Sequence, residues 1–431
     1  MSSEQGTRPQ LHAPPGATAK ISIIDSTMSI RNEQLESKLM TPLDGLRIIQ
    51  PITTWCFLIE QLSDGLGSGL ENDAAPAGKR KKAVWDLGAP TRPDDVYSPQ
   101  VLRDIADGGW KIGQDKSVAD ILKEGSVDPQ EVDSVIWSHH HFDHIGDPNS
   151  FPKSTEIVVG TGFTKAHLPG YPTNPKSELR DDYFEGRKLH EVDFGSSMLE
   201  IGGFRAIDFF ADGSFYLLDT PGHAVGHMSG LVRTTAAAAG DEEDTFIFLG
   251  DDICHHGGEL HPSPQPPLPT GAPALPDEIP DEVLRAVAQV IAAYGTCPGG
   301  QNLNSATFAL DMLRQLLRDL STARGRGGCS GDTKEQQPLF DTNLGRNLAQ
   351  MMQTLRRTHA SFDAADNVWC VFAHDMSLRD VVDAKGGLFP ARDANHWKRR
   401  GWDRSTQWRF LRDLVSAVEA VAPKGNETES N

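Results

Sequence analysis

The sequence predicts a layered α/β fold in which helices cover β-sheets, and three features support this prediction. Short apolar runs bounded by turn-forming residues are typical of buried strands. Helical periodicity, with apolar residues three and four positions apart, is concentrated in the second half of the chain. Strands are followed by helices, and then by strands and helices again, which favours sheets that are covered by helices.

The expected strands are apolar runs that end at turn-forming residues. They span residues 54–60, 82–88, 133–138, 155–160, 204–219 (a hairpin), 228–235, 245–250 and 367–373. The expected helices have a helical spacing of apolar residues, and one of them begins with Pro-Asp-Glu and ends at Gly295. They span residues 117–125, 280–295, 305–323, 344–362 and 406–422.

The composition is that of a globular protein with long connections. The 431 residues include 41 Gly and 28 Pro, and 38% of them are hydrophobic, which is enough to bury a core. No apolar run approaches the roughly 20 residues of a membrane span, and the net charge of −19 argues against nucleic acid as a partner. The 5 scattered cysteines favour a reducing compartment. We therefore predict a cytoplasmic protein that acts on a small molecule, without nucleic acid or membrane as partner, and whose oligomeric state the sequence leaves open.

The chain is predicted to form one large domain over residues 21–425. Residues 1–20 have no apolar stretch and are expected to be a disordered leader, and residues 426–431 a flexible tail. Within the domain, residues 261–280 are a proline-rich insertion, and residues 325–338 are a second flexible loop.

Four expected strands end in histidine or aspartate, and this clustering predicts a metal site. The strand at 133–138 is followed by the dense cluster HHHFDH. Three later strands end in DTPGH, GDD and HD. Rigid strand ends fix ligand geometry well, and imidazole together with carboxylate suits a divalent ion such as zinc.

These motifs, in this order, resemble those of the metallo-β-lactamase superfamily. HHHFDH matches the family pattern His-x-His-x-Asp-His, and TPGH, GD and a late strand-end histidine follow it. The resemblance implies a four-layer αββα sandwich, here with proline-rich and helical insertions, and a dinuclear site between its two sheets. The implied ligands are His139, His141 and His223 for the first metal, and Asp143, His144 and His374 for the second. Asp251 is implied as the carboxylate that bridges the two metals.

Two zinc ions per chain are the expected cofactor, with Mn²⁺ or Fe²⁺ as alternatives. Two metals roughly 3.5–4 Å apart share a bridging hydroxide that is nucleophilic near neutral pH, and either metal polarises a carbonyl group. The residues expected to take part in catalysis are Asp143, which orients the nucleophile, and Asp251, which bridges the ions. The predicted reaction is the hydrolysis of a carbonyl compound.

Other residues near the motifs are expected to support the ligands or to contact the substrate. Asp86 matches an early aspartate that the family uses mainly for structure around the site, and His227 is expected to support its loop through hydrogen bonds. His140 occupies an x position of the motif, where its side chain points away from the metals. Cys254 and His255 follow the expected bridging aspartate and are candidates for substrate contact.

The stretch between the histidine cluster and TPGH is most similar to the quorum-quenching lactonase branch, which opens acyl-homoserine lactones and other cyclic esters. One departure is that these lactonases usually carry a tyrosine three residues after the bridging aspartate, where this chain has Cys254. The predicted substrate is therefore a small lactone or a related ester. The alternatives are a thioesterase acting on polyketide or acyl thioesters and a lactamase that opens a small cyclic amide. A non-catalytic ligand-binding relative is disfavoured because all seven implied ligands are present.

Overall fold

The computed structural model describes residues 8–40, 46–62, 80–260, 340–407 and 409–416. The sequence predicts one domain over residues 21–425, whereas the chain divides into two compact units. The first, here called the sheet unit, comprises residues 1–33, 50–255 and 344–403. The second unit comprises residues 34–49, 256–343 and 404–431. The expected insertion 261–280, the loop 325–338, the tail 426–431 and the helices 280–295 and 305–323 lie outside the described residues.

The first sheet of the sheet unit has the strand order β1-β3-β4-β6-β7-β8. Its strands are β1 (Ala19–Asp25), β3 (Trp55–Gln61), β4 (Lys82–Trp85), β6 (Ser134–Ile136), β7 (Glu156–Val159) and β8 (Leu189–Glu191). Strands β4, β6, β7 and β8 are parallel to one another, whereas β3 is antiparallel to β4. The loops that follow β4 and β6 therefore leave the sheet at the same edge.

The second sheet has the strand order β14-β13-β12-β11-β10-β9. Its strands are β9 (Glu200–Ile201), β10 (Phe204–Asp208), β11 (Phe215–Asp219), β12 (Met228–Thr235), β13 (Thr245–Asp251) and β14 (Val368–Phe372). Only β13 and β14 pair in parallel within this sheet, and β11 runs in the same direction as β13 because β12 is antiparallel to both. Strands β11, β13 and β14 thus end at one edge.

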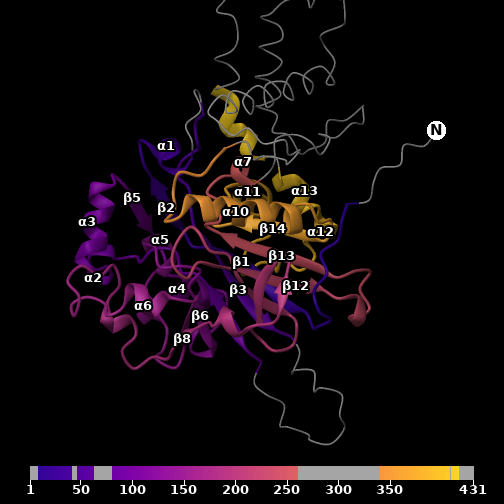
Figure 1. Ribbon diagram of the computed structural model, residues 1–431, viewed down its shortest axis with the longest axis horizontal. Coiled ribbons are helices and arrows are strands. Elements are labelled where there is room, and N and C mark those ends of the chain that lie inside the picture. Colours follow the sequence, from indigo (N-terminus) through magenta and orange to yellow (C-terminus); the bar gives the residue numbers. More distant parts are fainter. Residues whose placement is uncertain (1–7, 41–45, 63–79, 261–339, 408, 417–431) are drawn as a thin grey trace, which may run out of the picture. The chain divides into compact units, whose positions relative to one another are not determined.

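The two sheets face each other across an apolar core (Figure 1). Alternate residues of β3 show this arrangement, because successive side chains of a strand point to opposite faces. Trp55 and Phe57 belong to the core between the sheets, whereas Cys56 belongs to the cluster on the outer face. Phe215 of β11 packs edge-on against Trp85 of β4, with ring centroids 6.3 Å apart. Burying a side chain of this size contributes about 1.5–3 kcal/mol.

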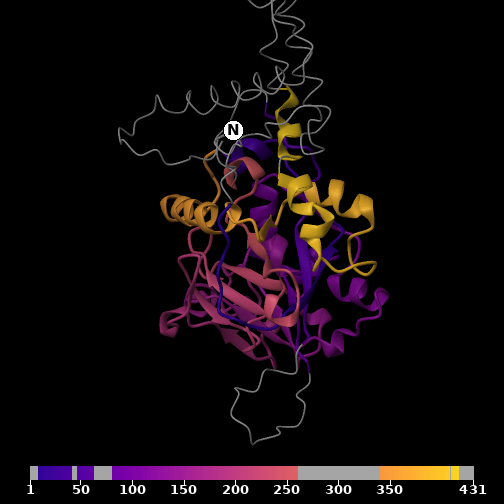
Figure 2. The ribbon, with the colours of Figure 1, turned by 90° about the vertical axis from the view of Figure 1, so that its right-hand side faces the viewer.

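Helices on the outer faces complete four layers. Helices α4 (Val118–Glu124) and α6 (Phe163–His167) bury apolar residues against the outer face of the first sheet. Helix α10 (Leu348–Thr358) continues into η7 (His359–Asp363), where Phe362 stacks on Phe248 of β13 with ring centroids 4.6 Å apart. Figure 2 shows α10 in orange and the purple helices on opposite sides of the strands. This is the αββα order that the sequence predicts.

Shorter elements fill the rest of the described chain. Strands β2 (Met28–Arg31) and β5 (Lys111–Gln114) form a separate two-stranded sheet. Further α-helices of the sheet unit are α2 (Pro93–Val96), α3 (Pro99–Asp107), α5 (Phe142–Ile145), α11 (Ser377–Val381) and α12 (Trp397–Arg400).

The described part of the second unit contains α1 (Leu35–Leu39), α7 (Gly257–Leu260) and η9 (Arg409–Leu414). His256 joins these segments. Its Nδ1 accepts the N–H of Gly258 at 3.1 Å, so its Nε2 is the donor toward Asp413 Oδ2 at 3.2 Å. Asp413 Oδ1 in turn accepts the N–H of Ile49 at 3.1 Å. His256 therefore has a structural role in this unit.

All the expected strands are present, as β3, β4, β6, β7, the β10–β11 hairpin, β12, β13 and β14. Strands β1, β2, β5, β8 and β9 were not predicted; β1 has seven residues and lies partly in the expected leader, and the other four have two to four residues each. The expected helix 117–125 is α4, and 344–362 is α10 with η7. In place of the start of the expected helix 406–422, α13 (Trp402–Gln407) begins four residues earlier and is followed by η9.

The prediction of a disordered leader over residues 1–20 does not hold for residues 8–20. Ala19 and Lys20 already belong to β1, which pairs with β3. Upstream of them, the N–H of Leu11 donates to Asn367 Oδ1 at 2.8 Å, and the N–H of Ala17 donates to the carbonyl oxygen of Asp212 at 2.8 Å. These bonds join segments far apart in the sequence, so local composition does not reveal them. In the part of the chain that the structure describes, none of the helices has the length and apolar character that crossing a bilayer requires.

The core between the sheets predicts a large effect of truncating Phe215, which is fully buried. Phe215→Ala should lower the free energy of unfolding by about 3–5 kcal/mol, because the cavity left behind adds to the lost transfer free energy. Reversible urea denaturation measures this change. Met198→Ala is the control, since Met198 is 98% exposed and its truncation should change stability by less than about 0.5 kcal/mol. Equal effects of the two substitutions would contradict this account of the core.

Candidate metal centre

Side chains from both sheets of the sheet unit meet where five strands end. The loops after β4 and β6 come from the first sheet, and those after β11, β13 and β14 come from the second. A hydrogen bond joins the loop after β6 to the start of β12: the N–H of Met228 donates to the carbonyl oxygen of Ser138 at 3.0 Å. The strand ends therefore hold the polar groups of this edge in fixed positions.

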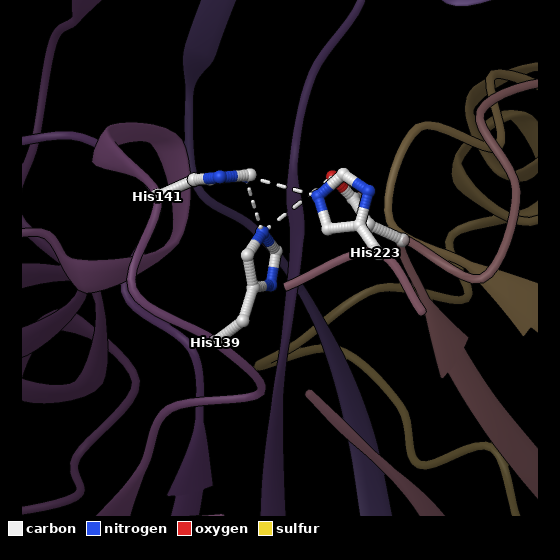
Figure 3. A group of neighbouring side chains, drawn as sticks. His139, His141 and His223 are labelled. Atoms are coloured by element: carbon white, nitrogen blue, oxygen red, sulfur yellow. Dashed lines mark hydrogen bonds and ion pairs between the residues drawn. The ribbon is translucent and has the colours of Figure 1, made fainter. Parts of the chain in front are cut away.

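Three imidazoles form the first group, here called site A: His139, His141 and His223. Nε2 of His139 lies 3.0 Å from Nδ1 of His141, and Nε2 of His223 lies 2.9 Å from the same atom. The ring centroids are 4.6–4.8 Å apart, and the planes are within about ten degrees of perpendicular. Figure 3 shows the three rings pointing toward one another. Three ring nitrogens thus converge on one point.

The second group, here called site B, consists of Asp143, His144 and His374. Oδ2 of Asp143 lies 3.5 Å from Nε2 of His144 and 3.6 Å from Nε2 of His374. The far nitrogen of each ring is engaged: Nδ1 of His374 donates to the carbonyl oxygen of Thr53 and Nδ1 of His144 donates to Asp86 Oδ2, both at 2.8 Å. Each ring therefore turns Nε2 toward site B, which is how outer hydrogen bonds orient metal ligands.

The carboxylate of Asp252 lies between the two sites. Its Oδ2 is 3.3 Å from Nε2 of His223 in site A and 3.5 Å from Nε2 of His144 in site B. Its Oδ1 is 3.4 Å from Nε2 of His374. Asp252 is 2% exposed, so this charge is withdrawn from water and is compensated only within the site.

Asp251, which the sequence predicts as the bridging residue, does not lie between the sites. Its Oδ2 accepts the Nε1–H of Trp85 at 2.7 Å, and its Oδ1 lies 2.8 Å from Ser138 Oγ and 3.0 Å from Nδ1 of His144. It therefore faces the back of the His144 ring. The motif contains two successive aspartates, and Asp251 has a positive φ of 55° beside a register shift in β13. Sequence alone does not show which of two adjacent side chains such a bend turns inward.

Asp86 supports the same ring from behind. It is fully buried, and it accepts the N–H and the Oγ–H of Ser138 at 2.8 Å in addition to its bond with His144. Burial and the neighbouring Asp251 carboxylate raise the pKa of Asp86 well above its usual value. Because the two carboxylates approach the same imidazole nitrogen, Asp86 and Asp251 together fix the orientation of His144.

The remaining residues that the sequence analysis named, His227, His255 and Cys254, differ in how close they lie to sites A and B. His227 is buried, and its Nδ1 donates to the carbonyl oxygen of Thr220 at 2.8 Å, which ties together the two ends of the loop that carries His223. Nε2 of His255 lies 3.4 Å from Asp252 Oδ2, and its ring is nearly parallel to that of His374. Cys254 is buried and belongs to none of the described groups that are compact enough to share an ion.

Protonation differs between the two sites. Burial lowers the pKa of His139 well below its usual value and that of His141 to about 3, so both are neutral at pH 7, the form that binds metal. Burial also lowers the pKa of His374, but the carboxylates of Asp252 and Asp143 outweigh it and raise that pKa to about 9. In the metal-free protein, a proton on His374 thus compensates the buried carboxylates.

Helix α10 fixes the loop of His223 from outside. The N–H of Arg346 donates to the carbonyl oxygen of His223 at 2.8 Å, and Thr354 Oγ1 donates to that of Pro221 at 2.7 Å. Gly222 has a φ of +138°, and a Cβ on it would lie 2.4 Å from the backbone nitrogen of Met351. The glycine of TPGH is therefore required for the packing of α10. The sequence contained no signal for these contacts, which join residues more than 100 positions apart.

The donor sets fit divalent cations. A tetrahedral zinc ion with bonds of about 2.0–2.1 Å spaces its ligand atoms about 3.3 Å apart, and the nitrogens and oxygens of sites A and B are spaced by 2.9–3.7 Å. Nε2 of His144 is buried and has no hydrogen-bond partner among the described residues. Neutral imidazoles and carboxylates in this arrangement are the ligands that zinc prefers.

Residues 78–237 match a family model described as the metallo-beta-lactamase superfamily. The chain is 34% identical over 418 residues to gamma-lactamase FDB1 of Fusarium pseudograminearum, which covers 96% of this chain and 86% of that protein. It is 32% identical over 434 residues to metallo-hydrolase mfmC of Annulohypoxylon moriforme, covering 97% and 95%. It is 33% identical over 135 residues to N-acyl homoserine lactonase AttM of Rhizobium johnstonii, covering 30% and 47%.

The tight packing of Gly222 generates a prediction. Gly222→Ala should distort the loop of His223, because the added Cβ meets the backbone of Met351. The variant should bind less zinc per chain, as measured by atomic absorption after dialysis, and should have a lower Tm. Gly186→Ala is the control: its φ is also positive, at 67°, but nothing lies within 4 Å of its Cβ. Equal zinc content in the wild type and Gly222→Ala would contradict the proposed role of this glycine.

The raised pKa of His374 predicts how metal binding depends on pH. Zinc must displace the proton that His374 holds below pH 9, so zinc affinity should increase as the pH rises from 6 to 9. Calorimetric titration in two buffers of different ionisation enthalpy should show the release of at least one proton per chain at pH 7. An affinity that is constant between pH 6 and 9 would show that His374 is already neutral.

Proposed function

The chain belongs to the metallo-β-lactamase superfamily of hydrolases, and we propose that it uses two zinc ions to open the ring of a small cyclic amide. The observation that carries this proposal is the geometry around Asp252, whose two oxygens lie 3.3–3.5 Å from ring nitrogens of both sites. Family membership implies a divalent metal centre, and the proposal specifies two ions and their identity as zinc.

Seven residues of the chain would hold the two ions. The proposed ligands are His139, His141 and His223 for the first, Asp143, His144 and His374 for the second, and Asp252 between them. Asp252 replaces Asp251 in this assignment, and Asp251 instead orients His144 through its contact with Nδ1. When bound, such a pair of ions supplies Lewis acidity and a water molecule whose pKa is lowered toward 7.

Asp143 is placed to handle the proton of the reaction. Burial raises the pKa of its carboxyl group, but His144 and His374 outweigh burial and keep the pKa below its usual value. The group is therefore a carboxylate at pH 7. Attack of water on the ring carbonyl forms a C–O bond and breaks the C–N bond of the lactam. We assign to the carboxylate of Asp143 the transfer of the water proton to the departing ring nitrogen.

His255 is placed to contact the carbonyl group of the substrate. It is 3% exposed, and its Nε2 lies 3.4 Å from Asp252 Oδ2, beside both sites. In the lactonases that this chain resembles, a tyrosine three residues after the bridging aspartate contacts the lactone carbonyl. Counted from Asp252 rather than Asp251, that position is His255 and not Cys254. An imidazole N–H at this position donates a hydrogen bond to the developing oxyanion.

Cyclic amides are favoured over cyclic esters by the extent of the relationships. The relative named as a gamma-lactamase aligns with 96% of this chain, whereas the lactonase aligns with 30%. A small lactone is the second candidate, since the chemical step at the acyl carbon is the same. A cytoplasmic location, and the lack of nucleic-acid and membrane partners, stay predictions.

The test combines zinc analysis with hydrolysis of a five-membered lactam, the lactone of the same ring and an acyl thioester. About two zinc ions per chain with opening of the lactam supports the proposal. Two ions with activity on the lactone or thioester alone keeps the centre and refutes the substrate. Bound zinc without any turnover would favour a ligand-binding protein.

The two adjacent aspartates provide the sharpest test of the assignment. Asp252→Asn should reduce bound zinc to one ion or fewer per chain and lower kcat about 10²-fold or more, because the carboxylate between the sites is lost. Asp251→Asn should still bind two ions, with an affinity about 10–100-fold lower, as expected for a residue that orients a ligand. The reverse pattern, with two ions retained only in Asp252→Asn, would restore Asp251 as the bridging residue.

A further inference from the structure

A cavity of about 470 Å³ opens beside site A within the sheet unit. Two of the site A ligands, His141 and His223, form part of its wall. A substrate whose reacting carbonyl lies at the metal centre therefore has room to extend a substituent into this cavity. The volume is within the range of sites that bind small molecules.

The side chains of the cavity wall give it an excess of positive charge. Arg346 and Lys176 both line it, and both are exposed. Among the described residues, neither makes a side-chain hydrogen bond or an ion pair. The carboxylate of Glu178 also lines the cavity, but its Oε2 is already 2.8 Å from Nε2 of His140. The cavity is thus lined by two cations without a side-chain partner among the described residues and by one carboxylate that is already paired with His140. This contrasts with the net charge of −19 of the whole chain.

The cluster of His140, His167 and Glu178 is compact enough to share an ion, yet its geometry does not fit one. The rings of His140 and His167 stack with centroids 3.8 Å apart and planes inclined by 31°. Stacked rings direct their nitrogen lone pairs side by side, whereas the nearly perpendicular rings of site A converge. Burial lowers the pKa of both imidazoles to about 4, so they add no charge at pH 7.

The backbone of Arg346 is fixed relative to the metal centre. Its N–H donates to the carbonyl oxygen of His223 at 2.8 Å, and the next N–H, of Asn347, donates to that of Gly222 at 2.9 Å. The guanidinium therefore starts from a point tied to a proposed metal ligand. A planar guanidinium matches the two oxygens of a carboxylate, and this pairing is directional as well as charged.

We propose that this cavity binds an oxyanion substituent of the substrate, a carboxylate next to the ring that is opened, through Arg346 and Lys176. The inference rests on the proposed ring-opening function and specifies its substrate class as an anionic cyclic amide. The substituent holds the ring so that its carbonyl lies toward site A and His255. Charge, and not only ring size, then selects the substrate.

Two matched pairs of probes test the proposal on the zinc-loaded protein. The binding pair is cyclopentanecarboxylate and cyclopentanecarboxamide, neither of which has a cyclic amide or ester to open, with Kd measured by calorimetry. The kinetic pair is a five-membered lactam with a carboxylate, or a carboxamide, on the carbon next to the ring nitrogen. Wild-type protein should prefer the carboxylate in both pairs by about tenfold, the typical effect of a hydrogen bond to a charged group. Arg346→Gln and Lys176→Gln should each reduce this preference and leave the carboxamides unchanged.

The control variant is Arg31→Gln, which removes an exposed cation that does not line the cavity and should keep the wild-type preference. A wild type that binds both members of each pair equally would refute the subsite. So would a preference that persists undiminished in Arg346→Gln and Lys176→Gln, since the metal centre alone would then hold the carboxylate. If neither lactam is opened but the binding preference depends on Arg346, the subsite stands and the ring-opening function is refuted.

Discussion

The buried carboxylate of Asp252 is the group on which the rest of the centre depends. A carboxylate at 2% exposure is costly unless positive charge lies close to it, and here ring nitrogens of His223, His144 and His374 lie within 3.3–3.5 Å. In the metal-free protein, protons on imidazoles provide that charge. Divalent cations provide this positive charge in place of the protons and bind the deprotonated imidazoles. The geometry that stabilises Asp252 therefore also favours metal binding.

A second layer of contacts explains why the imidazoles keep this geometry. Asp86 and Asp251 have positive φ angles of 54° and 55°, and both carboxylates approach the back of His144. Trp85 and Ser138 hold Asp251 in turn. Strained backbone at two neighbouring strand ends is tolerated where the surrounding structure fixes it, and such strain concentrates at functional sites. The αββα core supplies that support, because Trp85 also packs between the sheets.

Much of the fold and of the ligand set could be predicted from the sequence, for a physical reason. Buried strands are continuous apolar runs, and polar ligands that follow them lie at a sheet edge, so β6, β11, β13 and β14 could be predicted together with the histidines and aspartates at their ends. The choice between Asp251 and Asp252 could not be predicted, because it depends on the local backbone at the end of β13, where Asp251 has a positive φ beside a register shift. Nor could the role of Arg346, whose contact with His223 spans more than 100 residues and leaves no periodic signal.

The loop before α10 connects the proposed site A with the proposed substrate cavity. Arg346 and Asn347 hold the backbone of His223 and Gly222, so any shift of this loop moves a site A ligand and the cavity wall together. Site A and the cavity therefore cannot vary independently in shape, whereas their side chains can vary in charge. A hydrolase built in this way changes substrate by replacing exposed residues such as Lys176 and Arg346, while the glycine and the histidine beneath them stay constrained by packing. In the proposed assignment, the cavity wall thus determines which substrate binds, and the residues at the strand ends determine how it reacts.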